Sequence, residues 1–103
     1  MTQRTGFVLH VRPDKIDEYI TAHRNVWPEM LGALRAAGVR NYTIFRDGNS
    51  VFGYFEADDL ESAAAFLEGE EVNHRWQNAM AALLEERVPD GGPPALEQIF
   101  RLD

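Results

Sequence analysis

The strongest constraint on this 103-residue chain is the order in which strand-like and helix-like patterns follow one another. Short runs rich in apolar and β-branched residues predict strands, and apolar residues recurring every three or four positions predict helices. The patterns are a strand at 6–12, a helical stretch at 16–34, strands at 40–46 and 50–57, helices at 60–68 and 70–88, and a strand at 96–102. The predicted order is therefore β-α-β-β-α-β.

Turn and cap residues support these boundaries. Asp47-Gly48-Asn49 lies between the second and third strands and is typical of a hairpin. Pro28 cannot donate the backbone hydrogen bond of a helix interior, so we expect the first helical stretch to kink or restart near 25–28. Asp58 followed by Glu61 resembles a capping box that opens the helix at 60–68, and Gly69 separates this helix from the next.

This element order is that of a ferredoxin-like α+β fold, a four-stranded antiparallel sheet with helices on one face. We expect a single domain over residues 1–103. The strands carry large apolar residues on both faces, for example Phe45 beside Ile44 and Phe52 beside Val51. Helices on one side leave the second face uncovered, and a homodimer is the simplest cover. The predicted assembly is a dimeric α+β barrel with a pocket in the remaining space.

Composition excludes several classes of function. The chain has no cysteine, which excludes a thiol nucleophile and a cysteine-ligated metal centre. Its formal net charge of −7 disfavours nucleic acid and anionic membrane surfaces as partners. Metal-binding and phosphate-loop motifs are absent from the sequence, so we expect neither a metal nor a cofactor. A signal-peptide core and an apolar run long enough for a bilayer span are also absent, and we expect a cytoplasmic protein.

One helical segment carries candidate chemistry. Tyr19 and His23 are four residues apart and therefore lie on one helix face. Histidine exchanges protons in both directions near neutral pH. We expect the helix end before Pro28 to favour the protonated form of His23, because free carbonyls and the negative helix end attract a cation.

The same residues have a purely structural interpretation. Tyrosine and histidine on an apolar stripe often pack as half-buried side chains, and Trp27-Pro28 is most simply core followed by a kink. Tyr42 on a strand and Trp76 on a helix stripe are ordinary core positions. Spacing alone leaves both interpretations open.

Several segments together resemble one family, the L-rhamnose mutarotases. Residues 23–30 read HRNVWPEM and match that family's H-x-x-x-W-P-E-[LM] signature, preceded by Tyr19. Further matches follow in order: GVRNY at 38–42, RW at 75–76 with Met80, and LEQIF at 96–100. The resemblance extends from about residue 6 to residue 103 and implies a dimeric ferredoxin-like fold.

The resemblance also implies an activity and a site. His23 falls on the family's proton donor, and Tyr19 and Tyr42 fall on sugar-binding tyrosines. Trp76 and Gln77 stand where better-known members have two consecutive tryptophans. Gln77 can hydrogen-bond a hydroxyl but offers no stacking face. The implied substrate is L-rhamnose or a related 6-deoxy aldose, a small neutral monosaccharide.

The implied reaction interconverts the α and β anomers by acid/base ring opening and closure, without metal, nucleotide or covalent adduct. Two other functions remain compatible with the fold. One is a cofactor-free monooxygenase or haem-related enzyme of the dimeric α+β barrel type. The other is a non-enzymatic dimerisation or binding module in which Tyr19, His23 and Trp27 form an interface.

Overall fold

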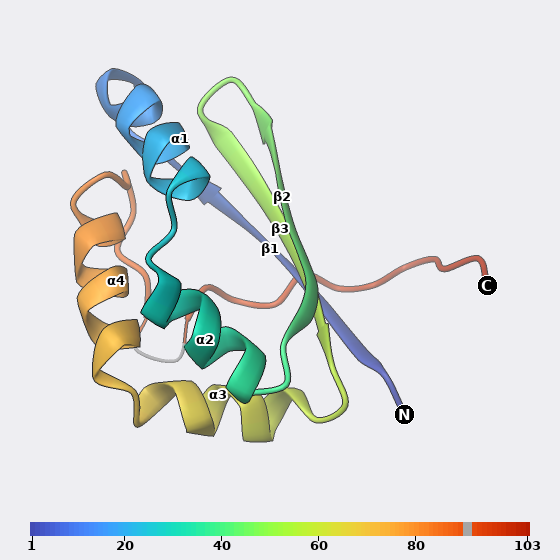
Figure 1. The fold of residues 1–103 in the computed structure, drawn as a ribbon. Helices are drawn as coiled ribbons and strands as arrows, with labels where there is room; N and C mark the ends of the chain where they lie inside the picture. Colours follow the sequence, from blue (N-terminus) through green and yellow to red (C-terminus); the bar gives the residue numbers. More distant parts are fainter. Residues whose placement is uncertain (90–91) are drawn as a thin grey trace.

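The computed structural model describes residues 1–89 and 92–103. Its elements, in chain order, are β1 (Gln3–His10), a 3-10 turn (Pro13–Lys15), α1 (Ile16–Arg24), α2 (Pro28–Ala36), β2 (Arg40–Asp47), β3 (Ser50–Ala57), α3 (Leu60–Glu68) and α4 (Glu71–Ala81). The described α-helices lie on one side of an antiparallel sheet (Figure 1), which confirms the predicted α+β class. None of these helices is long and apolar enough to cross a membrane.

The predicted interruption of the first helix is confirmed. α1 ends at Arg24, and α2 begins at Pro28, the residue whose missing N–H and fixed φ suit a first helical position. Between them Trp27 is extended, with φ −57° and ψ 133°. Its carbonyl accepts the amide protons of Met30 and Leu31 and so starts the new helix. The break places Trp27 outside both helices.

The predicted hairpin and the predicted division of the second helical region at Gly69 are also confirmed. Two details of that helical region, the N-cap of α3 and the end of α4, differ from the prediction. The cap of α3 is Asp59, whose carboxylate accepts the Ser62 amide at 3.0 Å, and not Asp58. α4 ends at Ala81 and does not continue to residue 88. Beyond the helix the chain pairs with the residues that follow β1: Arg12 N–H donates to the Leu83 carbonyl at 2.8 Å, and Val11 forms an isolated bridge with Leu84.

The sheet has three strands in the described residues, in the order β1-β3-β2. The fourth strand predicted at 96–102 is wrong for this chain alone. Leu96 N–H donates to the Gly6 carbonyl at 2.8 Å, and the chain then leaves β1 and extends away from the side of the sheet that carries the helices (Figure 1). Alternating polarity predicted a strand, but a strand also needs a partner edge.

The two faces of the sheet differ sharply in burial. The helix side holds the core, with Val11 and Val51 fully buried and Phe7 6% exposed. The ring of Phe7 lies over Gly53 on the neighbouring strand, and a Cβ at Gly53 would overlap it. On the opposite face Phe45 and Phe52, which pair across β2 and β3, are 67% and 43% exposed. The two-sided apolar sheet predicted from the sequence is therefore present, and its outer face is open in the single chain.

Candidate active site

An aromatic cluster surrounds His23 on the helix side of the sheet. Tyr19 and His23 project from one face of α1, and their rings stack with centroids 4.2 Å apart. The ring of Trp76, from α4, meets His23 edge-on at 5.4 Å. Trp27, from the break between α1 and α2, in turn meets Trp76 edge-on at 5.1 Å. The helical spacing thus brings Tyr19 and His23 together, and the fold adds both tryptophans.

One nitrogen of His23 is committed to the backbone. Nδ1 lies 2.8 Å from the carbonyl oxygen of Tyr19, one turn earlier. A carbonyl oxygen can only accept a hydrogen bond, so Nδ1 is the donor in both the neutral and the charged form. This leaves Nε2 as the nitrogen that gains and loses a proton.

The pKa of His23 lies below its ordinary value of 6.5. Burial is the main cause because it disfavours the charged form, and the hydrogen bond to the Tyr19 carbonyl offsets it only in part. The prediction that the helix end would favour the protonated form is therefore wrong. Asn25 instead satisfies carbonyls freed at the break. Its side-chain amide donates to the Thr21 carbonyl at 3.0 Å, and its backbone N–H donates to the Ala22 carbonyl at 3.3 Å.

The two tyrosines are held in their neutral form. Burial raises the pKa of Tyr19 to about 12, and Tyr19 itself is 5% exposed. Tyr42 is 41% exposed as a residue, yet its hydroxyl is buried, and this burial raises the pKa of Tyr42. The nearby phenol of Tyr19 raises it further. At neutral pH both hydroxyls therefore keep their protons, so they are available as hydrogen-bond donors and do not act as bases.

Tyr42 reaches this region from the sheet. Its ring packs against Phe55 of β3, with centroids 5.0 Å apart, and edge-on against Phe7 of β1 at 6.3 Å. Both phenylalanines are on the helix side of the sheet, where Phe55 packs against the smaller core cluster around Val39 and Ala57. Tyr42 thus faces the same side as Tyr19 and His23.

Trp76 and Gln77 are separated by the helix although they are adjacent in sequence. Trp76 is 8% exposed and belongs to the core as well as to the surroundings of His23. Gln77 is exposed, and its amide donates to the Asn73 side chain at 3.3 Å on the same helix. The structure therefore joins Tyr19, His23 and Trp76 directly, and it places Gln77 outside that group.

The structural interpretation of the sequence placed Trp27 in the core, but Trp27 lies at the surface. Its exposed fraction is 36%, and it lines a hollow of about 400 Å³ together with Pro28, Val72, and the ion pair of Arg75 and Glu29 at 3.4 Å. The signal was present in the sequence: a residue directly before a helix-starting proline lies outside the helix stripe.

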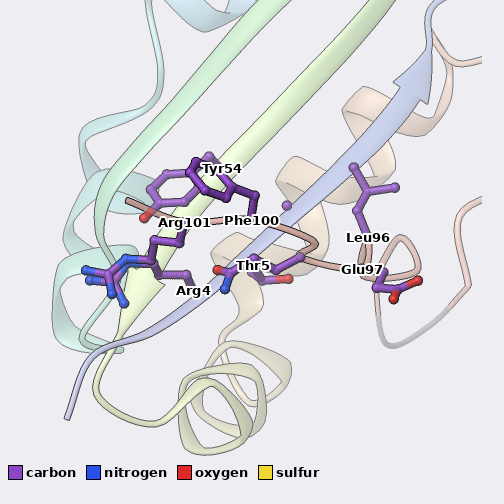
Figure 2. Close-up of a pocket in the computed structure, with 9 residues that line it drawn as sticks. Arg4, Thr5, Tyr54, Leu96, Glu97, Phe100 and Arg101 are labelled. Carbon is purple, nitrogen blue, oxygen red and sulfur yellow. The ribbon is translucent and has the colours of Figure 1, made fainter. Parts of the chain in front are cut away.

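A second hollow of about 320 Å³ lies on the other side of the sheet. Arg4 and Tyr54 from the strands face Leu96, Phe100 and Arg101 of the C-terminal segment across it (Figure 2). Neither hollow is lined by His23 or Tyr19. Among residues 1–89 and 92–103, no three His, Asp or Glu side chains are grouped so that they could hold a metal ion.

Comparison with known proteins decides the family. The family model for L-rhamnose mutarotase matches residues 4–102. The chain belongs to the L-rhamnose mutarotase family. An L-rhamnose mutarotase from Oceanobacillus iheyensis is 36% identical over 98% of this chain and 99% of its own length. One from Burkholderia cenocepacia is 39% identical over 95% and 96%.

The structural comparison agrees. The crystal structure of an L-rhamnose mutarotase from Formosa agariphila superimposes with a TM-score of 0.79 at 26% identity, covering 98% of this chain and 99% of that one. The resemblance noted in the sequence is thus confirmed over nearly the whole chain. Membership in the L-rhamnose mutarotase family does not favour the monooxygenase, haem-related or non-enzymatic alternatives.

Proposed function

We propose that this chain is an isomerase that interconverts the α and β anomers of L-rhamnose, with His23 as its catalytic residue. The observation that carries the proposal is the hydrogen bond from Nδ1 of His23 to the Tyr19 carbonyl. This bond leaves one nitrogen, Nε2, to exchange protons, and two neutral tyrosines are on the same side of the sheet. Family membership supplies the substrate class.

Ring opening and ring closure each need two balanced proton transfers. Protonated Nε2 gives its proton to the ring oxygen of the sugar while the anomeric hydroxyl loses its own proton, and the bond between the ring oxygen and C1 breaks to give an aldehyde. Rotation about the C1–C2 bond presents the other carbonyl face. Ring closure then returns the proton to Nε2, and a proton from solvent completes the anomeric hydroxyl. Such acid/base catalysis typically contributes about 10²–10⁴-fold in rate.

The lowered pKa of His23 suits this cycle. Its protonated form is a stronger acid than an ordinary imidazolium, which helps it to protonate a weakly basic ring oxygen. Tyr19 and Tyr42 stay protonated, so they orient sugar hydroxyls by donating hydrogen bonds. Water is then the simplest acceptor for the proton of the anomeric hydroxyl.

The aromatic rings provide the apolar part of the site. Trp76 lies against His23, and Trp27 extends the aromatic surface toward solvent. Aromatic faces pack well against the C–H faces of sugars. Gln77 is exposed on α4, and the bond to Asn73 uses one N–H of its amide, so the amide oxygen and the second N–H are left for the proposed contact with a substrate hydroxyl.

The proposal extends to a homodimer in which a second copy covers the outer face of the sheet. Phe45, Phe52 and Tyr54 expose 67%, 43% and 36% of their surface there. The C-terminal segment also exposes Ile99 and Phe100 at 88% and 78%. Light scattering is expected to give twice the chain mass of 11.7 kDa for the wild type and the single-chain mass for Phe52→Glu. A wild-type monomer would contradict this part of the proposal. That the protein works in the cytoplasm stays a prediction.

The activity itself is tested by saturation-transfer NMR on a panel of aldoses. Irradiating the anomeric proton of one L-rhamnose anomer should weaken the signal of the other only when the protein is present. L-fucose, a second 6-deoxy sugar, and D-glucose measure how far the substrate range extends. If none of these sugars exchanges faster than in buffer, the proposed function is wrong.

A further inference from the structure

The strand that carries Tyr42 contains one extra residue just before it. Arg40 pairs with Glu56 and Thr43 pairs with Tyr54, so three steps along β2 correspond to two steps along β3. Two residues, Asn41 and Tyr42, therefore oppose the single residue Phe55. This is a β-bulge on an edge strand, because β2 has a strand neighbour on one side only among the described residues.

Asn41 has the backbone conformation that the bulge requires. Its φ is +53°, and it is the one residue other than glycine with a positive φ in the described part of the chain. Asparagine tolerates the left-handed region far better than β-branched residues do. A bulge of this kind usually places glycine at the left-handed position, and here Asn41 takes that place.

Side-chain contacts on the outer face hold Asn41 in this conformation. Its amide Nδ2 donates to Oε1 of Glu56 at 2.8 Å. The other carboxylate oxygen of Glu56 accepts the Tyr54 hydroxyl at 2.6 Å. These two hydrogen bonds, from Tyr54 first and then from Asn41, lower the pKa of Glu56, so that its carboxylate remains a charged acceptor at neutral pH.

The extra residue decides which way Tyr42 points. In a regular ladder Tyr42 would be opposite Tyr54 and would share the outer face with it, since paired residues project to the same side. With the bulge, Thr43 takes that position and Tyr42 projects to the inner face. The ring of Tyr42 accordingly packs on Phe55 and Phe7 of the inner face.

We infer that Asn41 is a positioning residue that acts on the substrate through Tyr42. Its left-handed backbone, tied to Glu56 on the outer face of the sheet, turns the Tyr42 hydroxyl toward the sugar site on the inner face. The effect on sugar binding rests on the proposed function, whereas the effect on the orientation of Tyr42 does not.

The test compares Asn41→Val with Asn41→Gly, using two readouts. Valine disfavours the left-handed conformation and glycine accepts it, although both remove the bond to Glu56. We expect Asn41→Val to weaken the NOE between the Tyr42 and Phe55 rings, whose centroids are 5.0 Å apart, and Asn41→Gly to retain it. We expect KM for L-rhamnose to rise about three- to tenfold in Asn41→Val, the effect of one lost hydrogen bond, with kcat changed by less than about twofold.

A double-mutant cycle with Tyr42→Phe shows whether the two residues act together. If Asn41 acts through the Tyr42 hydroxyl, Asn41→Val adds no further rise in KM once that hydroxyl is gone. Should Asn41→Val fail to fold, Asn41→Ala serves in its place, because alanine also disfavours the left-handed conformation but lacks the branched side chain of valine. The expected result is a weakened NOE and a smaller rise in KM.

An unchanged NOE in Asn41→Val, or an unchanged NOE and KM in Asn41→Ala, would overturn the inference. Additive effects of Asn41→Val and Tyr42→Phe on KM would overturn it as well. If the wild-type protein does not accelerate anomer exchange at all, the proposed function fails, and the NOE comparison still decides whether Asn41 orients Tyr42.

Discussion

Replacing His23 by asparagine removes proton transfer while keeping much of the local geometry. In the wild type Nδ1 donates to the Tyr19 carbonyl at 2.8 Å, and the amide of asparagine can donate a similar bond to a carbonyl one turn earlier. The amide has no second nitrogen that exchanges a proton. Loss of acid/base catalysis predicts a fall in kcat of about 10²–10⁴-fold, which corresponds to about 2.7–5.4 kcal/mol in the activation free energy.

The same substitution has a smaller effect on stability. It removes the stacked contact with Tyr19 and the edge-on contact with Trp76, at centroid distances of 4.2 and 5.4 Å. Each aromatic contact contributes about 0.5–1.5 kcal/mol beyond its area, so we expect a loss of about 1–3 kcal/mol in the free energy of unfolding. For a chain of 103 residues each kcal/mol lowers Tm by about 4–8 °C. The variant should therefore be folded at room temperature.

His74→Asn is the matched control. His74 is exposed on α4, and its ring is also bonded to a backbone carbonyl, that of Glu68, at 2.6 Å. It takes no part in the aromatic cluster, so kcat should be unchanged. The assay is saturation-transfer NMR of L-rhamnose at one pH, with Tm measured on the same samples. A folded His23→Asn variant with more than about a tenth of the wild-type kcat would refute the assignment of His23 as the proton-transferring group.

Three further predictions follow from the same geometry. Tyr19→Phe keeps the ring that stacks on His23 and removes one donor, so KM should rise about three- to tenfold with little change in Tm; an unchanged KM would argue against sugar binding by Tyr19. Because the folded pKa of His23 is below 6.5, the unfolded chain binds this proton more readily, and the free energy of unfolding should fall as pH drops below about 6.5; in His23→Asn this part of the loss should disappear from urea titrations at several pH values. Gly53→Ala would drive a Cβ into the ring of Phe7 and should cost about 1–3 kcal/mol by overpacking, whereas Gly32→Ala, with open space around it on α2, should stabilise by about 0.5–1 kcal/mol; equal Tm values for the two variants would contradict this packing.

Local signals predicted most of the fold. The helix break follows from the missing N–H of Pro28, and the hairpin follows from Asp47-Gly48-Asn49 between two apolar runs. The C-terminal strand could not be predicted in the same way. Its alternating pattern describes a strand, but the edge that pairs with it depends on tertiary or quaternary structure. In the single chain this segment makes one backbone bond to β1, between Leu96 and Gly6.

The site was predictable in part, for a similar reason. Tyr19 and His23 are one helical turn apart, and the period of the helix alone brings them together. The pKa direction of His23 was not predictable, because it depends on how far the side chain is buried against α4. The inward position of Tyr42 depends on a one-residue bulge, and simple alternation along a strand cannot reveal it. Trp27 leaves the helix stripe because of the proline that follows it.

We propose that this protein carries a proton-transfer site for sugar ring opening at His23. The most direct measurement is the exchange rate between the α and β anomeric protons of L-rhamnose, followed by saturation transfer at increasing protein concentration. We expect an exchange rate that rises in proportion to wild-type protein and stays at the buffer value with the same concentrations of folded His23→Asn. An exchange rate that does not depend on wild-type protein, or one that rises equally with both proteins, would contradict it.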